Sequence, residues 1–320
     1  MLRVKHRRFS NFRTPKAPTL SILGKNITYY QQRLSRSSSQ TQDLNGHFYS
    51  TIWKLMPKND PDVNVGQCLR TQQTLFDLRN HKLIDNHRYR LVYFYLYFTC
   101  QTHAITLLWR QLSYKDLTNV FDWFHAIYLT KKVNMFCFGG GSGCEIVGFY
   151  QYLKSFEIDA VFHCNIIDPY DWYNETDSLF PSIDPNLSIP TYYKFGFFQI
   201  HPYFYVKNRA LNELHNADVI TVGSYLSSFN AISSEVLLHF KFLLDHMKSS
   251  AMLFFFDKAE LGFLEAMRGI AESAGLMKID EVEDVTFSVP EHEEEAMKAH
   301  HFPIYPRTQF RACAGLWQKL

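Results

Sequence analysis

The stretch "VNMFCFGGGSGCEIVGFYQYL", residues 133–153, constrains the fold more than any other part of the sequence. An apolar run leads into four glycines within five positions, in a chain that has only 14 glycines among 320 residues, and an amphipathic segment follows. Glycine tolerates positive φ and lets the backbone approach a ligand without a Cβ in the way. The pattern predicts strand, tight turn and helix. The turn is either a purely structural corner or a place where a ligand meets the backbone.

Short apolar runs alternate with amphipathic segments throughout the residues that follow. We expect strands at 133–138, 160–168, 193–200 (the weakest), 217–223 and 251–257, with helices at 144–156, 233–247 and 261–275. Ser233 is the expected N-cap of the second helix, and Gly275 the expected end of the third. Continuous apolar strands alternating with helices favour a parallel sheet. Two final runs, 284–289 and 309–317, are typical of a closing antiparallel pair.

The chain divides into three parts on this interpretation. Residues 1–46 form a basic arm or targeting segment, 47–130 a helical N-terminal region, and 131–320 a doubly wound α/β domain. Apolar residues at helical spacing in "FYSTIWKLM" and "YKDLTNVFDWFHAIYL" support the helical region. Hydrophobic residues make up 46% of the chain, which is enough to bury a core.

Charge is distributed unevenly between the arm and the rest of the chain. Residues 1–42 hold nine Lys or Arg and no acid, whereas the remaining residues hold 24 basic and 31 acidic side chains. Three interpretations of the arm stay open: a segment that contacts RNA or another anionic surface, a mitochondrial presequence, or a solvated tail without a role. The acidic body argues against a broad nucleic-acid-binding face.

Six cysteines without a CxxC pair argue against both a metal site and a disulfide framework. We expect free thiols and an intracellular protein, with nucleus, mitochondrion and cytoplasm all open. The sequence contains no run of 18 or more apolar residues, so we expect no membrane span. The segment "EHEEEAMKAHH" lacks HExxH spacing, so we expect a solvated acidic face and no metal.

The glycine loop has a specific spacing. Gly139, Gly141 and Gly143 make GxGxG, and Asp168 ends the next strand 25 residues after Gly143. An acid at the end of the second strand is placed to hold ribose hydroxyls. The pattern is not GxGxxG, and no Gly-Lys-Ser/Thr follows that would make it a P-loop.

"FCFGGGSGCE" followed by "NIIDPYDW" resembles motifs I and II of class I S-adenosylmethionine-dependent methyltransferases. The resemblance covers roughly residues 130–317, including the terminal antiparallel hairpin. It implies a Rossmann-like fold and S-adenosylmethionine as cofactor. It also implies that Gly139, Gly141 and Gly143 lie under the cofactor and that Asp168 binds the ribose.

The sequence departs from the family pattern at one position. The family commonly has an acid two residues before the first glycine, where this chain has Cys137. Glu145, just past the loop, is the candidate to take over part of that role. A more distant resemblance is to the ribosomal-RNA uridine-N3 group of methyltransferases, which share a GGGxGxE-type loop.

The segment after the fourth strand, "VGSYLSSF", bears on the methyl acceptor. It lacks the Asn/Asp-Pro-Pro-Tyr of enzymes that methylate exocyclic amines, and it lacks the Pro-Cys of covalent pyrimidine-C5 methylation. A nitrogen or oxygen atom therefore remains as the candidate methyl acceptor. Among residues at the strand ends, Gln199 and Ser224 are further cofactor candidates, whereas His201 and Tyr225 are candidates to orient or deprotonate the substrate.

Together these patterns predict a methyltransferase that acts on a nitrogen or oxygen, with an RNA base as the expected substrate. The arm would supply the contacts to RNA phosphates. Two alternatives stay open: a small-molecule or protein methyltransferase, and a non-catalytic scaffold with the same fold. The sequence leaves the oligomeric state open.

Overall fold

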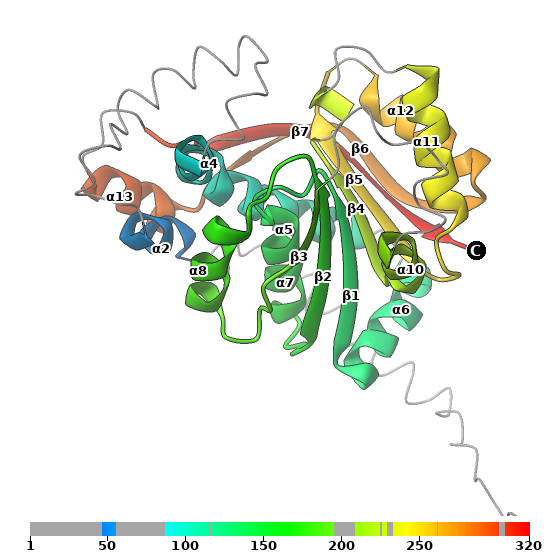
Figure 1. Ribbon diagram of the computed structural model, residues 1–320, viewed down its shortest axis with the longest axis horizontal. Helices are drawn as coiled ribbons and strands as arrows, with labels where there is room; N and C mark the ends of the chain where they lie inside the picture. The colour runs from blue at the N-terminus through cyan, green and yellow to red at the C-terminus, as the bar shows by residue number, and fades with distance from the viewer. Residues whose placement is uncertain are drawn as a thin grey trace, which may run out of the picture.

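A central sheet flanked by helices on both faces organises the chain (Figure 1). The structure is a computed structural model that describes residues 47–55, 87–114, 117–194, 209–224, 226–228, 233–260, 262–300 and 305–320. Before the sheet come α2 (Phe48–Leu55), α4 (His87–Tyr93), the π-helical turn η3 (Phe94–Phe98), α5 (Thr99–Tyr114) and α6 (Leu117–Thr130). The arm and the candidates Gln199, His201 and Tyr225 lie outside the described residues.

The strands follow in the order β1 (Lys132–Phe138), β2 (Val161–Asp168), β3 (Thr191–Lys194), β4 (Val219–Gly223), β5 (Met252–Lys258), β6 (Leu276–Ser288) and β7 (Gln309–Lys319). Between them lie α7 (Cys144–Lys154), α8 (Tyr173–Ile183), α10 (Arg209–Asn216), the 3-10 turn η4 (Leu226–Ser228), α11 (Ser234–Asp245), α12 (Phe263–Ser273) and α13 (Glu291–Ala299). Ser233 accepts a hydrogen bond from the Val236 amide, which confirms it as an N-cap. Gly275 follows α12 at φ +74°, as expected of a helix-ending glycine.

The sheet has the order β3-β2-β1-β4-β5-β7-β6. Strands β1 to β5 pair in parallel, whereas β7 runs antiparallel to both β5 and β6. The last strand of the chain therefore lies between two strands that precede it. This confirms the predicted α/β class, with a mostly parallel sheet and a terminal antiparallel hairpin.

Alternate residues of the central strands face two separate apolar cores. Val133, Met135 and Cys137 of β1 pack with α5, α6 and α7, whereas Phe136 and Phe138 pack with α10, α11 and α12. Strand β5 divides in the same way. Burial on both faces explains why these strands are continuously apolar in the sequence.

The structure corrects the bounds of two predicted strands. β3 begins at Thr191 rather than at Tyr193, and residues 195–200 of the prediction lie outside the described part of the chain. β6 is 13 residues long and begins directly after Gly275, where the sequence predicted a strand only from Asp284. Its acidic residues conceal its strand character, because β6 is an edge strand, and charged side chains are a common protection of such edges.

Helix α13 corrects the expectation of a fully solvated acidic face. The Glu293 carboxylate is completely buried and accepts hydrogen bonds from the amides of Phe48, at 2.7 Å, and Tyr49, at 3.1 Å. It thereby caps the N-terminus of α2 across 245 residues of sequence. His103 Nε2 lies 3.4 Å from the same carboxylate. The helices before β1 share one apolar core with the sheet.

Helices α5 and α7 cross closely beside the sheet. A Cβ at Gly148 of α7 would lie 2.7 Å from Cγ2 of Ile105 and 3.0 Å from the carbonyl oxygen of Thr102. The Thr106 hydroxyl donates across the same contact to the Gly148 carbonyl, at 3.0 Å. A glycine is therefore needed where the two backbones approach each other.

In the part of the chain that the structure describes, no helix combines the length and apolarity needed to cross a bilayer. The five cysteines within these residues are buried and unpaired. Among the same residues, no group of three or more His, Cys, Asp or Glu side chains is arranged to hold a metal ion.

Candidate cofactor site

The glycine loop connects β1 to α7 at the carboxyl edge of the sheet. The Gly139 amide donates to the Ile167 carbonyl at 2.8 Å, which extends the pairing of β1 with β2 into the loop. Gly139 and Gly143 have φ of +67° and +72°, a region that side chains other than glycine rarely adopt. Gly143 is the N-cap of α7, and its carbonyl receives the first hydrogen bonds of the helix.

Close packing favours glycine at two further loop positions. A Cβ at Gly140 would lie 2.7 Å from Cβ of Cys137, and one at Gly141 would lie 3.1 Å from the Trp172 indole and 3.3 Å from Oδ2 of Asp168. The loop is thus folded tightly against the end of β1 on one side and against Asp168 on the other.

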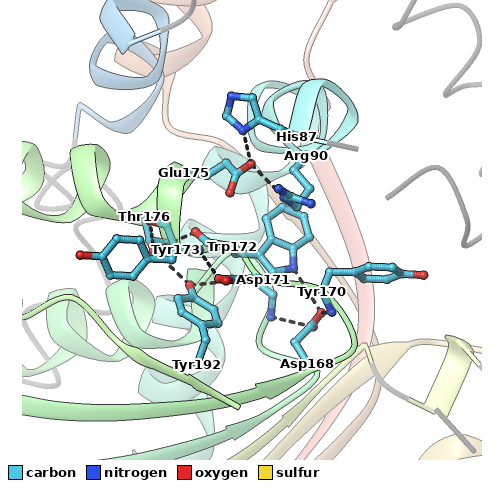
Figure 2. Close-up of polar contacts among 11 residues, drawn as sticks. His87, Arg90, Asp168, Tyr170, Asp171, Trp172, Tyr173, Glu175, Thr176 and Tyr192 are labelled. Carbon is cyan, nitrogen blue, oxygen red and sulfur yellow. Dashed lines mark hydrogen bonds and ion pairs between the residues drawn. The ribbon is translucent and has the colours of Figure 1, made fainter. Parts of the chain in front are cut away.

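Asp168 joins the glycine loop to the end of β2 (Figure 2). Its Oδ2 accepts the Gly141 amide at 3.1 Å, and its Oδ1 accepts the Tyr170 amide at 2.9 Å and Nε1 of Trp172 at 3.2 Å. Only 7% of the residue is exposed. Burial raises the pKa of Asp168 to about 6, although its hydrogen bonds and the charge of Arg90 act in the opposite direction.

Trp172 packs beneath the loop and orients Asp168. Its ring is buried and meets Tyr93 and Phe94 edge-on, with centroids 5.4 Å and 5.7 Å away. Because its N–H is donated to Asp168, the indole acts both as core and as a hydrogen-bond partner of the site. From β3, the Tyr192 hydroxyl donates to the Gly141 carbonyl at 3.3 Å and holds the loop from the other side.

A second buried carboxylate, Glu175, lies in the first turn of α8, three residues after Trp172 (Figure 2). Glu175 Oε1 accepts Nε of Arg90 at 2.9 Å and lies 2.6 Å from Nδ1 of His87. Arg90 is itself buried, so its charge acts on Asp168 through a medium of low dielectric. Helix α4 thereby contributes a cation to the carboxylates around the loop.

Glu145 lies in the first turn of α7, on the opposite side of the loop from Asp168. Only 2% of the residue is exposed, and its Oε1 would lie 2.2 Å from a Cβ at Gly223, the last residue of β4. Its Oε2 receives the Cys144 thiol at 3.3 Å. Burial, together with the nearby Asp168 carboxylate, raises the pKa of Glu145 to about 7, although the hydrogen bonds from its own amide and from the Cys144 thiol act in the opposite direction.

The loop after β4 is held by the end of β5. Ser224 has φ +49°, an uncommon conformation for a residue other than glycine, and its amide donates to the Phe256 carbonyl at 2.9 Å. The fully buried Asp257 accepts the Ser227 amide at 3.0 Å. Ser224 is thus fixed directly beyond Gly223, beside the Glu145 carboxyl group.

The structure brings together six of the predicted site residues at one edge of the sheet: Gly139, Gly141, Gly143, Glu145, Asp168 and Ser224. Gln199, His201 and Tyr225 lie outside the described residues, so their roles stay predictions.

Sequence reasoning missed the residues that position Asp168. The contact from Asp168 to the amide two residues on is an Asx turn, which Asp-Pro-Tyr could have indicated. Tyr192 and Arg90 come from β3 and α4 and carry no local sequence signal.

The residues present fit an adenosyl sulfonium cofactor. Beyond β2, the Asp168 carboxylate is placed to accept hydrogen bonds from ribose hydroxyls. Its two oxygens have about four lone-pair sites, of which the three donors above occupy three. On the β4 side, the buried Glu145 carboxyl group is a second acidic group beside the loop. Because the glycines of the loop lack side chains, a ligand can approach its backbone closely.

No family model matches the sequence, and no curated protein matches it. Solved structures do resemble it at low sequence identity. A magnesium protoporphyrin IX methyltransferase from Synechocystis, solved with S-adenosylmethionine bound, is 10% identical with a TM-score of 0.35, covering 68% of this chain and 84% of that one. An O-methyltransferase family protein from Burkholderia thailandensis is 11% identical with a TM-score of 0.35, covering 82% and 74%. The precorrin-6y C5,15-methyltransferase of Geobacter metallireducens is 13% identical with a TM-score of 0.33, covering 61% and 87%.

The strand order, the terminal hairpin and the contact between the glycine loop and Asp168 are observed directly in this structure and do not depend on the comparisons. The chain therefore has the Rossmann-like architecture that its resemblance to class I S-adenosylmethionine-dependent methyltransferases implies.

Proposed function

We propose that this protein transfers a methyl group from S-adenosylmethionine to a nitrogen or oxygen of an RNA base. The contact between the Gly141 amide and the Asp168 carboxylate carries the cofactor part of the proposal. It joins the glycine loop after β1 to the acid after β2, where open α/β sheets bind nucleotides. The raised pKa values of Asp168 and Glu145 beside this loop support a functional site.

Methyl transfer places modest demands on the chain's own residues. The cofactor, when bound, supplies an electrophilic methyl carbon on a sulfonium. The protein must align the acceptor with that carbon and exclude water. Ser224 and Ser227, held by the Phe256 carbonyl and the Asp257 carboxylate at the end of β5, are suited to line the acceptor site. His201 and Tyr225 remain the proposed residues that orient the acceptor or take its proton.

The uneven distribution of charge supports RNA as the acceptor. Residues 1–42 hold nine basic side chains and no acid, whereas the rest of the chain is acidic overall. In this proposal the arm supplies most of the phosphate contacts, so binding weakens steeply with salt.

One observation favours a scaffold without catalysis. Asp168 is already engaged by three donors that hold the loop and Trp172 in place, so binding two ribose hydroxyls requires one of them to be shared or displaced. A loop that serves only structure would need the same contacts.

Calorimetric titration with S-adenosylhomocysteine separates these functions. Saturable binding supports the methyltransferase, and lack of binding at millimolar ligand supports the scaffold. Incubation with methyl-labelled S-adenosylmethionine then tests the acceptor, with total RNA, a protein extract and a small-molecule extract as parallel substrates. Label in RNA supports the proposal, whereas label in another fraction alone replaces RNA with that substrate class.

A further inference from the structure

The Glu145 carboxyl group lies in an environment that lacks a partner of opposite charge. Its hydrogen bonds come from its own amide and from the Cys144 thiol, both neutral donors. Among the described residues, no Lys, Arg or His pairs with it. A buried ionised carboxylate without a cation is costly, so a positive group that enters the site would stabilise the ionised form of Glu145.

The position of Glu145 indicates which positive group this is. Strand β1 lies between β2 and β4, and the glycine loop leaves its end. Asp168 lies at the end of β2, and the Glu145 carboxyl group lies at the end of β4, against Gly223. A cofactor whose ribose is bound by Asp168 and which crosses the loop therefore directs its other end toward Glu145.

The strand position that usually carries the acid of this loop holds Cys137, which is buried and cannot supply a charge. Burial raises the pKa of the Cys137 thiol well above its usual range, so that it stays neutral, and the nearby Glu145 carboxylate adds to this. The Glu145 carboxyl group lies against Gly223, and the preceding residue Val222 pairs with Phe138, so the carboxyl group of α7 lies close to the end of β1. Glycine at position 223 leaves the space that Glu145 occupies.

We infer that Glu145 receives the α-ammonium group of the cofactor's methionyl end and so replaces, from the first turn of α7, the strand acid that is absent at Cys137. This rests on the proposed function, because it requires an adenosyl-methionyl ligand. The ammonium group would convert a buried carboxyl group without a cation into a charge-assisted pair.

Two ligands that differ only at the methionyl end provide the test. S-adenosylhomocysteine carries the amino-acid group, and 5′-methylthioadenosine lacks it. Glu145→Gln should weaken binding of S-adenosylhomocysteine about 10- to 100-fold, while binding of 5′-methylthioadenosine changes less than about threefold. Asp168→Ala should weaken both ligands. Glu265→Gln is the matched control, because Glu265 is an exposed glutamate in the first turn of α12, which also begins after a glycine at positive φ.

A second variant keeps the inference testable if Glu145→Gln disturbs folding. Cys137→Asp added to Glu145→Gln returns an acid to the end of β1 and should recover S-adenosylhomocysteine affinity by about tenfold. Equal loss of both ligands in Glu145→Gln, without recovery in the double variant, would assign Glu145 a structural role. Unchanged binding of S-adenosylhomocysteine in Glu145→Gln would overturn the inference while leaving the proposed function intact. If the parent binds neither ligand, the proposed function fails and the inference fails with it.

Discussion

Two acids beside the glycine loop bind protons more tightly in the folded chain than in the unfolded one. Burial raises the pKa of Glu145 to about 7 and that of Asp168 to about 6. For a carboxyl group with a raised folded pKa, the free energy of unfolding falls as pH rises from the unfolded to the folded value, and is constant above it. The contribution of these two groups to the free energy of unfolding of the ligand-free protein should therefore be smaller at pH 8 than at pH 5.

Glu145→Gln should remove its part of this pH dependence. We expect the free energy of unfolding at pH 8 to rise by about 1–3 kcal/mol, because the buried charge is gone, with little change at pH 5. Urea unfolding at both pH values measures this, with Glu265→Gln as the unchanged control. A variant that is less stable than the parent at pH 8 would contradict the assignment of a buried ionised carboxyl group.

Asp168→Ala should weaken binding of S-adenosylhomocysteine on the order of tenfold to several hundredfold. It should also reduce stability by about 1–3 kcal/mol, because it leaves the amides of Gly141 and Tyr170 and the Trp172 indole without their acceptor. Asp168→Asn should be milder on both counts, since its amide oxygen still accepts. Calorimetry and thermal unfolding on the three proteins give both numbers, and full affinity in Asp168→Ala would exclude Asp168 as the ribose ligand.

At the scale of elements, two helical glycines should respond oppositely to the same substitution. Gly148→Ala places a Cβ against Ile105 and the Thr102 carbonyl, so we expect a loss of about 1–3 kcal/mol as α5 and α7 are forced apart. Gly269→Ala in α12 meets nothing within 4 Å and should stabilise the protein by about 0.5–1 kcal/mol.

Urea unfolding of both alanine variants checks this pair. Gly148→Ala should cost less stability when Ile105→Ala is also present, because the smaller side chain relieves the clash. A double-mutant cycle measures this difference. If Gly148→Ala were as stable as the parent, the close approach of the two helices would be wrong.

The elements that sequence analysis predicted are those whose signals are local. Continuous apolar strands, the Ser233 cap and the glycine loop all follow from neighbouring residues. The early part of β6 was missed because an edge strand needs no apolar alternation, and its acids concealed it. The role of Glu293 was missed because its partners, Phe48 and Tyr49, lie more than 240 residues away.

The candidate site was predictable to the same extent. The spacing from the loop to Asp168 indicated that this acid belongs with the glycine loop, and the structure shows the two in contact. The donors that hold Asp168 in place, and the proximity of Glu145 to Gly223, depend on which strands become neighbours in the sheet. Spacing along one chain does not encode that order.

For the whole molecule, two N-terminal truncations should differ sharply. Deleting residues 1–42 should leave the unfolding midpoint nearly unchanged, because that segment has no apolar periodicity, and should flatten the salt dependence of RNA binding. Deleting residues 1–55 also removes α2, whose Phe48, Tyr49 and Ile52 are buried and whose amides satisfy Glu293. That loss should cost several kcal/mol.

Denaturant unfolding and RNA titrations between low and high salt measure both effects. A large loss of stability in the shorter truncation would show that the arm packs on the domain. An unchanged midpoint in the longer one would contradict the capping of α2 by Glu293.

The position of β7 has a consequence for how the protein comes into being. This strand fills the gap between β5 and β6, and among the described strands β6 pairs with β7 alone. During synthesis the earlier strands can pair as they emerge, but the β5 edge stays open until residues 309–319 leave the ribosome. A premature stop codon between β6 and β7 would therefore yield a chain with an exposed, aggregation-prone edge at β5. Such a product is one that chaperones and proteases must clear.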